Sequence, residues 1–298
     1  MQLTSYLFYL RARNLSPRTI KATEEYLKPF LKNNDPLKAT RADIEMWLGD
    51  LAQRCKPSTV WTAWRHLRGF YIWLEQEGDV EQNPMLSVPK PLVPPTDIAV
   101  LTPQQVQLLL ETCGGKTLEC RRDYAIVSLL LDTGLRLSEV TNLKTSDIGE
   151  DYTLRVFGKG RKWRTVALGT TSATALQRWL RVRNGRDDFL WSGKRGPLTN
   201  VGMRKMIQRR GAQAGIKLHP HMLRHTWVDN WLRNGGSEVD LARLAGWTST
   251  RMAERYAQQR ADQRALDAHR WVSPLDRIGV NKPPISFDGI FQPVIFRT

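Results

Sequence analysis

The sequence is poor in cysteine and has no long hydrophobic run. Three cysteines, Cys55, Cys113 and Cys120, occur in 298 residues, and none belongs to a CxxC pair or has a histidine partner at zinc spacing. A number this small and odd argues against a disulfide framework and against a cysteine-based zinc site. No stretch approaches the roughly 18 apolar residues of a membrane span, and the N-terminus lacks the basic start and cleavage site of a signal peptide. We therefore expect a cytoplasmic protein.

Acidic residues are scarce beside basic ones. The chain has 45 lysines and arginines against 29 aspartates and glutamates, a net charge of +16. Residues 1–95 hold 13 basic and 10 acidic residues, so most of the surplus lies in the later part of the chain. A surplus of this size favours a polyanionic partner, of which nucleic acid is the commonest. With 41% hydrophobic residues and 11 tryptophans, the chain has enough apolar surface to exclude general disorder.

Prolines divide the chain. Five of the 16 prolines lie within residues 83–97, so that stretch is predicted to be neither helix nor central strand but an extended, semi-stiff linker. It separates a domain at residues 1–82 from a second domain at residues 98–272. The tail at residues 273–298 is broken by prolines yet apolar at its end. We expect it to dock on a neighbouring protomer, and folding back on its own domain is the alternative.

The first domain is predicted to be a bundle of four or five helices. Ser16-Pro17, Thr40 and Ser58 are each typical of a helix start, and apolar residues at helical spacing follow each of them. Arg65 and Arg68 flank the apolar face of the last of these helices, where they could meet phosphate groups or simply face solvent.

The second domain is predicted to be mainly α-helical with a small antiparallel β-sheet. An apolar helix covers residues 118–133 and ends at Gly134. The β-rich runs 152–157 and 163–168 flank a Gly-Lys-Gly-Arg-Lys turn, which indicates a hairpin. Further helices are expected at residues 171–183, 199–214, 221–234, 238–245 and 249–260.

Two cationic residues in this domain are suited to phosphate chemistry. Arg136, in Thr-Gly-Leu-Arg-Leu-Ser-Glu, follows a helix-ending glycine, and its planar guanidinium matches two phosphate oxygens. Lys159 lies between two glycines in the hairpin turn, where it could approach a phosphate and protonate a leaving oxygen. Each motif alone is equally typical of an ordinary surface residue.

A histidine-rich segment and a later tyrosine complete the candidates. A helix that begins near Pro220 places His221 and Arg224 three residues apart on one face. His225 is expected to point elsewhere, as a packed and hydrogen-bonded histidine. Three neighbouring histidines without carboxylates make a poor metal site, so no metal is expected. Tyr256 is an ordinary core or surface residue unless two arginines, a histidine and a lysine converge on it.

Together these segments resemble the tyrosine recombinase family, the phage integrases and their relatives. The resemblance covers nearly the whole chain: the proline-linked helical domain, TGLRLSE, the GKG hairpin, HMLRHT, and AGW followed nine residues later by tyrosine. It implies a SAM-like core-binding domain followed by a catalytic domain. The implied active-site residues are Arg136, Lys159, His221, Arg224 and the nucleophile Tyr256. Most members have histidine where this chain has Trp247, whose indole N–H can donate a hydrogen bond but cannot exchange a proton.

The resemblance further implies a site-specific recombinase or integrase. Such an enzyme cuts and rejoins double-stranded DNA through a 3′-phosphotyrosine and needs no metal, ATP or other cofactor. Glu139 is expected to hold the pocket together, and the candidate DNA contacts are Arg65, Arg68, Arg161 and Lys162. The assembly would be a homo-tetramer on two DNA sites and a monomer or weak oligomer when free. The chain looks like a short phage integrase without an arm-binding domain, with viral genome integration as one role and an accessory DNA-bending or directionality factor left open.

Three other interpretations stay open from the sequence. A nicking-closing topoisomerase of the type IB kind would share the chemistry, and a non-catalytic DNA-binding regulator would share the charge and the helices. A metal-dependent nuclease would need a cluster of acidic residues, which the sequence lacks.

Overall fold

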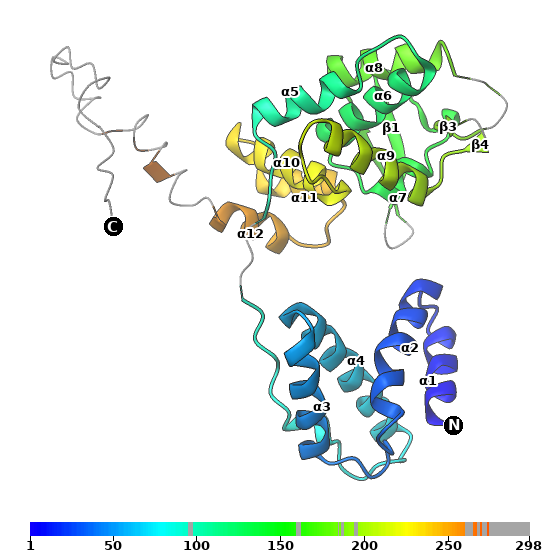
Figure 1. Ribbon diagram of the computed structural model, residues 1–298, viewed down its shortest axis with the longest axis vertical. Helices are drawn as coiled ribbons and strands as arrows, with labels where there is room; N and C mark the ends of the chain where they lie inside the picture. The colour runs from blue at the N-terminus through cyan, green and yellow to red at the C-terminus, as the bar shows by residue number, and fades with distance from the viewer. Residues whose placement is uncertain are drawn as a thin grey trace. The chain divides into compact units, whose positions relative to one another are not determined.

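The computed structural model describes residues 1–94, 98–158, 162–183, 185, 188–193 and 196–259, together with residues 265, 266, 269 and 273. The chain forms two compact units, an N-terminal unit at residues 1–96 and a C-terminal unit at residues 97–298 (Figure 1). Most of the predicted tail lies outside the described residues. Within the described residues, no helix is long and apolar enough to cross a bilayer.

The N-terminal unit is a helical bundle built from strongly capped segments. Its elements are α1 (Gln2–Ala12), α2 (Pro17–Leu31), α3 (Arg41–Arg54), α4 (Pro57–Gln76) and the short 3₁₀ helix η1 (Pro84–Leu86). The Ser16 hydroxyl accepts from the backbone N–H of Thr19, and Thr40 forms a capping box with Asp43. The sequence signals for these two helix starts are therefore confirmed.

Aromatic rings fill the core of the N-terminal unit. Helix α4 packs against α2 and α3 and buries Leu67, Phe70 and Tyr71 completely. Phe30 of α2 meets the Tyr71 ring edge to face, and Tyr6 of α1 lies 5.2 Å from the Phe70 ring. No charged side chain of this unit is buried among its described residues. Apolar side chains therefore make up the core of this bundle.

The start of the proline-rich stretch differs from the predicted linker. Pro84 begins η1, the Asn83 side chain accepts from the Met85 backbone N–H, and Met85 is completely buried against the bundle. Val88 is buried too, and its carbonyl accepts from the indole of Trp64 at 3.3 Å. A proline is compatible with the first position of a helical turn, so this stretch could fold onto the N-terminal unit instead of extending.

The C-terminal unit is mainly helical with small antiparallel sheets, as predicted. Its α-helices are α5 (Pro103–Thr112), α6 (Leu118–Thr133), α7 (Leu137–Thr141), α8 (Thr170–Leu180), α9 (Asn200–Gln213), α10 (Pro220–Arg233), α11 (Glu238–Ala245) and α12 (Arg251–Gln259). The 3₁₀ helix η2 covers Thr145–Asp147. The strands are β1 (Thr153–Phe157), β2 (Trp163–Ala167), β3 (Ser192–Gly193) and β4 (Gly196–Pro197).

Helix α6 is the centre of the C-terminal unit. Helices α8 and α10 pack against it, and its buried residues include Ile126, Val127 and Leu130 (Figure 1). Asp132, near the end of α6, accepts from the Gly169 N–H at the start of α8, so the two helices run antiparallel. Gly134 ends α6 with a φ of +57°, and a side chain there would overlap the Trp227 ring of α10. Only glycine suits this position.

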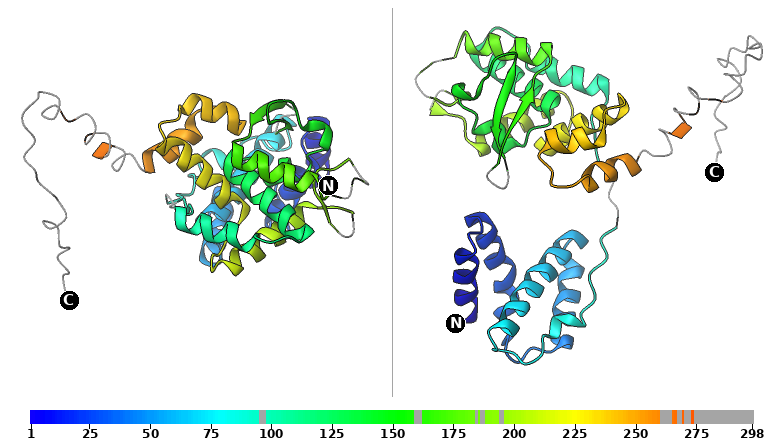
Figure 2. Two further views of the ribbon diagram at one scale, coloured as in Figure 1. Left: turned by 90° about the horizontal axis from the view of Figure 1, so that it is seen from above. Right: turned by 180° about the vertical axis from the view of Figure 1, so that it is seen from behind.

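The hairpin β1–β2 has one buried and one exposed face. Figure 2 shows the hairpin strands side by side. Their antiparallel register pairs Val156 with Arg164 and Phe157 with Trp163. Val156 and Val166 face the core, whereas Phe157 and Trp163 are about half exposed. The hairpin therefore brings Arg164 to the inner side.

Candidate active site

Arg136 is oriented by a buried carboxylate. It is the N-cap residue of α7, its Nη1 donates to Glu139 Oε1 at 2.9 Å, and its backbone N–H donates to Glu139 Oε2 at 2.8 Å. The Glu139 side chain is 3% exposed, whereas that of Arg136 remains 26% exposed. One edge of the guanidinium therefore stays within reach of an anion from solvent.

Arg164 belongs to the same cluster, although the sequence patterns did not single it out. Its two Nη atoms donate to the two carboxylate oxygens of Glu139 at 3.0 and 2.8 Å. Such a bidentate pair fixes geometry as well as charge. The sequence does contain a signal for this position. Arg164 lies two residues before the buried Val166 on β2, so both side chains are on the same, inward face of the strand.

The charge of Glu139 is maintained by this cluster. Burial would raise the pKa of the Glu139 carboxyl. Hydrogen bonds from Arg164 and from the Arg136 backbone, together with the charges of both side chains, instead hold that pKa below its ordinary value. Glu139 is therefore a carboxylate near neutral pH.

The end of α11 brings three arginines together. Arg164, Arg224 and Arg136 donate to the consecutive carbonyls of residues 244–246, at 2.8, 2.9 and 3.4 Å respectively. A helix leaves its last carbonyl groups unsatisfied and its C-terminal end carries partial negative charge, so it attracts cations. These arginines come from β2, α10 and the start of α7, which are far apart in the sequence.

Arg224 is the most buried arginine of the group. Only 7% of it is exposed, and it also donates to the carbonyl of Gly134. Burial, together with the charge of Arg136, lowers the pKa of Arg224 to about 10, which still leaves it charged near neutral pH. No carboxylate in the described part of the chain forms an ion pair with it. Its positive charge is therefore held in place without being neutralised, which suits it to bind an anion.

Tyr256 of α12 lies between two rings. It stacks on Trp247 with an interplanar angle of 17° and a centroid distance of 6.2 Å, and its hydroxyl is hydrogen-bonded to Nδ1 of His225. The guanidinium carbon of Arg224 lies 5.4 Å from the centre of the Trp247 ring. Only 6% of Tyr256 is exposed, within a small apolar cluster that joins α10, α11 and α12. Trp247 thus connects the tyrosine to the arginine cluster.

The expectation that His225 points away from the candidate residues is wrong. Helix α10 begins at Pro220 as predicted, with His219 as its N-cap. His221 and His225 are four residues apart, a spacing that brings side chains together on a helix, and their rings lie 6.3 Å apart. Desolvation, together with the charges of His219 and Arg224, lowers the pKa of His221, whose side chain still reaches solvent.

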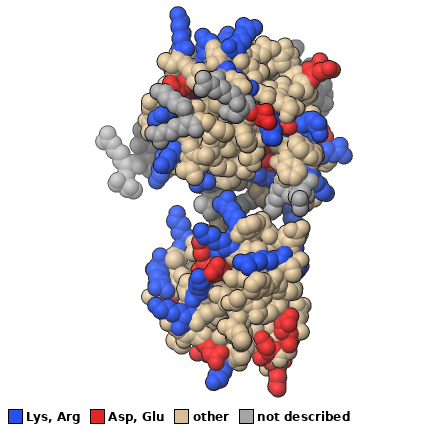
Figure 3. All heavy atoms as spheres, turned by 90° about the vertical axis from the view of Figure 1, so that its right-hand side faces the viewer, with Lys and Arg blue, Asp and Glu red and all other residues tan. Residues whose placement is uncertain are grey.

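Other candidates are not joined to this cluster by the described contacts. Lys159 and Arg161 lie outside the described residues, and Lys162 is exposed beside β2. In the N-terminal unit, Arg65 and Arg68 lie over the rings of Trp61 and Trp64, at 5.2 and 5.3 Å from the ring centres. Lysines and arginines are spread over the visible face of both units, and acidic side chains of the N-terminal unit gather toward its lower end (Figure 3).

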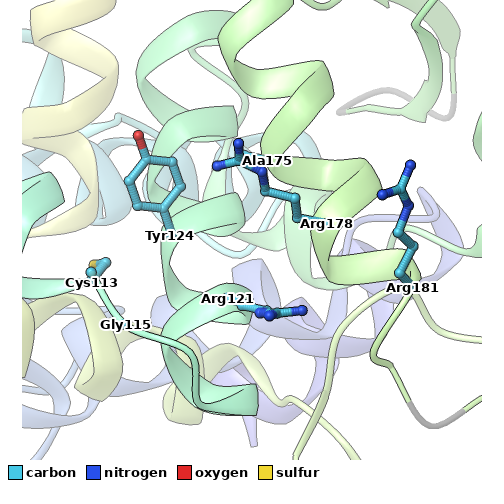
Figure 4. Close-up of a pocket in the computed structure, with 8 residues that line it drawn as sticks. Cys113, Gly115, Arg121, Tyr124, Ala175, Arg178 and Arg181 are labelled. Carbon is cyan, nitrogen blue, oxygen red and sulfur yellow. The ribbon is translucent and has the colours of Figure 1, made fainter.

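A separate pocket lies at the other end of α6. It has a volume of about 470 Å³, and Arg121, Tyr124, Arg178 and Arg181 are among its lining residues (Figure 4). Arg121 and Tyr124 belong to the first half of α6, whereas Gly134 and the arginine cluster follow its last turn. Among the described residues, no group of three or more histidines, cysteines or carboxylates could hold a metal ion.

The sequence matches known families over both units. Residues 99–263 match the phage integrase family, and residues 3–78 match the phage integrase N-terminal SAM-like domain. A tyrosine recombinase XerC from Oceanobacillus iheyensis is 30% identical over 286 residues, which cover 88% of this chain and 92% of the relative. A tyrosine recombinase XerD from Listeria monocytogenes is 30% identical over 258 residues, which cover 80% and 87%. The predicted resemblance and the two-part fold are confirmed.

Solved structures share the fold. The Tn1549 transposon integrase in complex with a circular intermediate DNA has a TM-score of 0.73 and 20% identity, with 86% of this chain and 94% of that chain covered. A lambda integrase tetramer bound to a Holliday junction has a TM-score of 0.73 and 16% identity, with coverage of 86% and 76%. At these identities the likeness concerns the arrangement of the backbone.

Proposed function

This chain belongs to the phage integrase family and is a tyrosine-type site-specific recombinase; we propose that Tyr256 is its nucleophile. The observation that carries the proposal is the layer of Tyr256, Trp247 and Arg224, with Arg136 bound to the adjacent end of α11. In the proposed reaction the Tyr256 oxygen attacks a DNA phosphate. A 3′-phosphotyrosine forms and the 5′-oxygen leaves.

Arg136 and Arg224 stabilise the charge that develops in this step. Attack on a phosphodiester places extra negative charge on the non-bridging oxygens in the transition state. Arg224 forms no ion pair with a carboxylate among the described residues, and the Arg136 side chain is partly exposed, so both are suited to bind those oxygens. Glu139 and Arg164 hold the cluster in place from behind.

The remaining residues handle protons and orientation. Lys159, on the hairpin turn, protonates the departing 5′-oxygen, and His221 orients the phosphate. Trp247 packs against Tyr256 and can donate its indole N–H to a phosphate oxygen. Because the phosphotyrosine conserves the energy of the broken bond, rejoining needs no ATP, and the arginines supply the positive charge that metals supply in nucleases.

The partner is double-stranded DNA. Residues 1–82 and 98–272 bind it as a DNA-binding domain and a catalytic domain, and Arg65, Arg68, Arg161 and Lys162 contribute phosphate contacts. Two duplexes with two cuts each require four protomers, so the active assembly is a tetramer on DNA, in which the tail at residues 273–298 docks on a neighbour. The enzyme acts in the cytoplasm, where its DNA substrates are.

A nicked suicide duplex that carries the target site tests the proposal. On this substrate the wild-type protein should form a covalent complex that withstands denaturing electrophoresis, in EDTA and without ATP. Tyr256→Phe should form none, because it lacks the attacking oxygen, while its affinity for DNA stays within about twofold. A covalent complex formed by Tyr256→Phe would remove Tyr256 from its role, and a requirement for a divalent metal would point to a different chemistry.

A further inference from the structure

His225 touches the reacting atom of the proposed nucleophile. Its Nδ1 is hydrogen-bonded to the Tyr256 hydroxyl, and the centres of the two rings lie 5.5 Å apart. His225 is half-buried in the middle of α10, one turn beyond His221, and α10 packs directly against α12. Two packed helices therefore fix both members of this pair, which gives the contact a defined geometry.

In this contact the imidazole of His225 can act as a base and the phenol of Tyr256 as an acid. A phenol loses its proton with a pKa of about 10, so near neutral pH an attacking tyrosine must pass its proton to another group. A neutral imidazole has an ordinary pKa of about 6.5 and accepts a proton through the nitrogen that carries no hydrogen. With the hydrogen on Nε2, Nδ1 of His225 faces the Tyr256 hydroxyl as the acceptor.

Neighbouring groups are less suited to this step. Trp247 stacks flat on the Tyr256 ring, and an indole N–H is a donor only. Arg224 is a permanent donor whose hydrogen bonds go to backbone carbonyls. His221 is the exposed histidine of the pair, which suits it to meet the phosphate on the open side.

We propose that His225 is the general base that takes the phenolic proton of Tyr256. This inference rests on Tyr256 being the nucleophile. As the Tyr256 oxygen bonds to phosphorus, its proton moves to Nδ1 of His225. The 5′-oxygen departs with the electron pair of the broken P–O bond and takes a proton from Lys159. In rejoining, the 5′-hydroxyl attacks phosphorus and returns its proton to Lys159, and the leaving Tyr256 oxygen recovers its proton from His225.

The titratable or charged groups near His225 include residues of its own helix and of α12. His221, Arg224 and Asp229 lie on its own helix, and Tyr256 lies on α12. Because two histidines are close together, an acid limb in the pH profile of cleavage cannot be assigned from the wild type alone. His221→Asn is therefore the matched control for any variant of His225.

The test is the single-turnover rate of covalent complex formation on the suicide duplex, from pH 5.5 to 9. His225→Asn places an amide oxygen near the Nδ1 position, so it can keep the hydrogen bond but cannot hold a proton. We expect a loss of about 10²- to 10⁴-fold at neutral pH, the usual range for a general base, with DNA affinity unchanged. The acid limb of the pH profile should vanish in His225→Asn and persist in His221→Asn.

A second substrate separates the two ends of the reaction. When sulfur replaces the bridging 5′-oxygen, the leaving group no longer needs a proton. Lys159→Ala should recover on this substrate, whereas His225→Asn should not, because its defect concerns the attacking oxygen. If His225→Asn recovers, His225 serves the leaving group and the inference is wrong.

The outcomes also separate this inference from the proposed function. A His225→Asn rate within threefold of wild type, with the acid limb intact, overturns the role of His225 while an inactive Tyr256→Phe leaves the nucleophile in place. A covalent complex from Tyr256→Phe overturns the proposed function itself. Should His225→Asn bind DNA poorly, His225→Ala with added imidazole replaces it: restored cleavage supports the base, and no restoration in a variant that binds DNA counts against it.

Discussion

Asp123 and Glu139 are two buried carboxylates of the C-terminal unit, and arginines surround each of them. Asp123, on α6, forms ion pairs of 2.8 to 3.2 Å with Arg122, Arg209 and Arg210. Glu139, on α7, pairs with Arg136 and Arg164 at 2.9 and 2.8 Å. By composition and distance the two clusters are alike.

Their other contacts differ. In the Asp123 cluster, Arg122 also donates to the Ser192 carbonyl and Arg210 to that of Thr112, whereas Arg209 is largely exposed. The Glu139 cluster is bound to the end of α11 beside Arg224, and Arg136 keeps an exposed edge. A buried ion pair is therefore no mark of function by itself. What distinguishes the second cluster is its position at the end of α11, next to Arg224 and the layer of Trp247 and Tyr256.

Removing Asp123 should produce the largest effect on folding. Asp123→Ala leaves buried arginines without their counter-charge, and breaking such a pair costs about 3–5 kcal/mol. We expect the unfolding free energy in denaturant to fall by that amount, while the folded fraction still cleaves the suicide duplex. Normal stability combined with lost cleavage would reverse the assignment of the two clusters. Asp123→Asn, which keeps the shape, should lose less.

Arg224 and Arg210 offer a matched pair, because each is 7% exposed. Arg224→Ala should lower the cleavage rate about 10²- to 10³-fold, or about 2.7–4 kcal/mol of transition-state stabilisation, with DNA affinity within about threefold. Arg210→Ala should lower the melting temperature and leave cleavage by folded protein unchanged. Equal losses of cleavage and affinity in Arg224→Ala would demote Arg224 to a binding contact.

Glu139→Gln should weaken both properties, because Glu139 orients Arg136 and Arg164. We expect cleavage to fall about 10- to 100-fold, as for a small misplacement of catalytic groups. The loss of charged hydrogen bonds should cost about 1.5–3 kcal/mol of unfolding free energy near pH 7. An unchanged cleavage rate would show that Arg136 needs no such support.

The difference in stability between wild type and Glu139→Gln should depend on pH in one direction only. The pKa of Glu139 lies below its ordinary value in the folded protein, so ionised Glu139 stabilises the fold above its unfolded pKa of about 4.3. That contribution is lost as pH falls through the folded pKa. Calorimetry of wild type and Glu139→Gln should therefore show a difference in stability that is large near pH 7 and shrinks below about pH 4. A difference that grows in acid would contradict the lowered pKa.

The smallest effect is expected outside both clusters. Arg65 is exposed over the ring of Trp61 and has no carboxylate partner among the described residues. Arg65→Ala should weaken DNA binding modestly and reduce the slope of log affinity against log salt by about one, as for a single phosphate contact. Cleavage at saturating DNA should be unchanged. A salt slope equal to that of wild type would exclude Arg65 as a phosphate contact.

Local signals in the sequence predicted the elements well. Ser16 and Thr40 cap helices as their spacing indicates, and Gly134 ends α6 in the left-handed conformation. The hairpin strands also agree with the predicted runs. Each of these features depends on residues within about four positions of one another, so the chain carries the information locally.

The site was harder to predict at Arg164 and His225, because their roles depend on the direction in which each side chain points. Arg164 is charged, yet strand alternation places it on the same inner face as Val166. His225 lies four residues after His221, and this helical spacing brings their two rings together. The prolines of residues 83–97 predict an extended linker, because proline interrupts helices and strands. Pro84 instead occupies the first position of η1, and residues 83–88 fold onto the N-terminal bundle. At all three places a short-range pattern in the sequence is consistent with the observed structure, but another short-range pattern favours a different one.

The amino-acid order by itself determined the helices, the hairpin, the excess of positive charge and the four segments in which the reactive groups occur. Tertiary packing added Arg164 to the carboxylate of Glu139, buried Arg224 without a carboxylate ion pair among the described residues, and placed His225 against Tyr256. The physical reason is distance along the chain. Caps and turns close over a few bonds, whereas the hydrogen bond from Arg136 to the Gly246 carbonyl joins residues 110 positions apart and exists only in the folded unit.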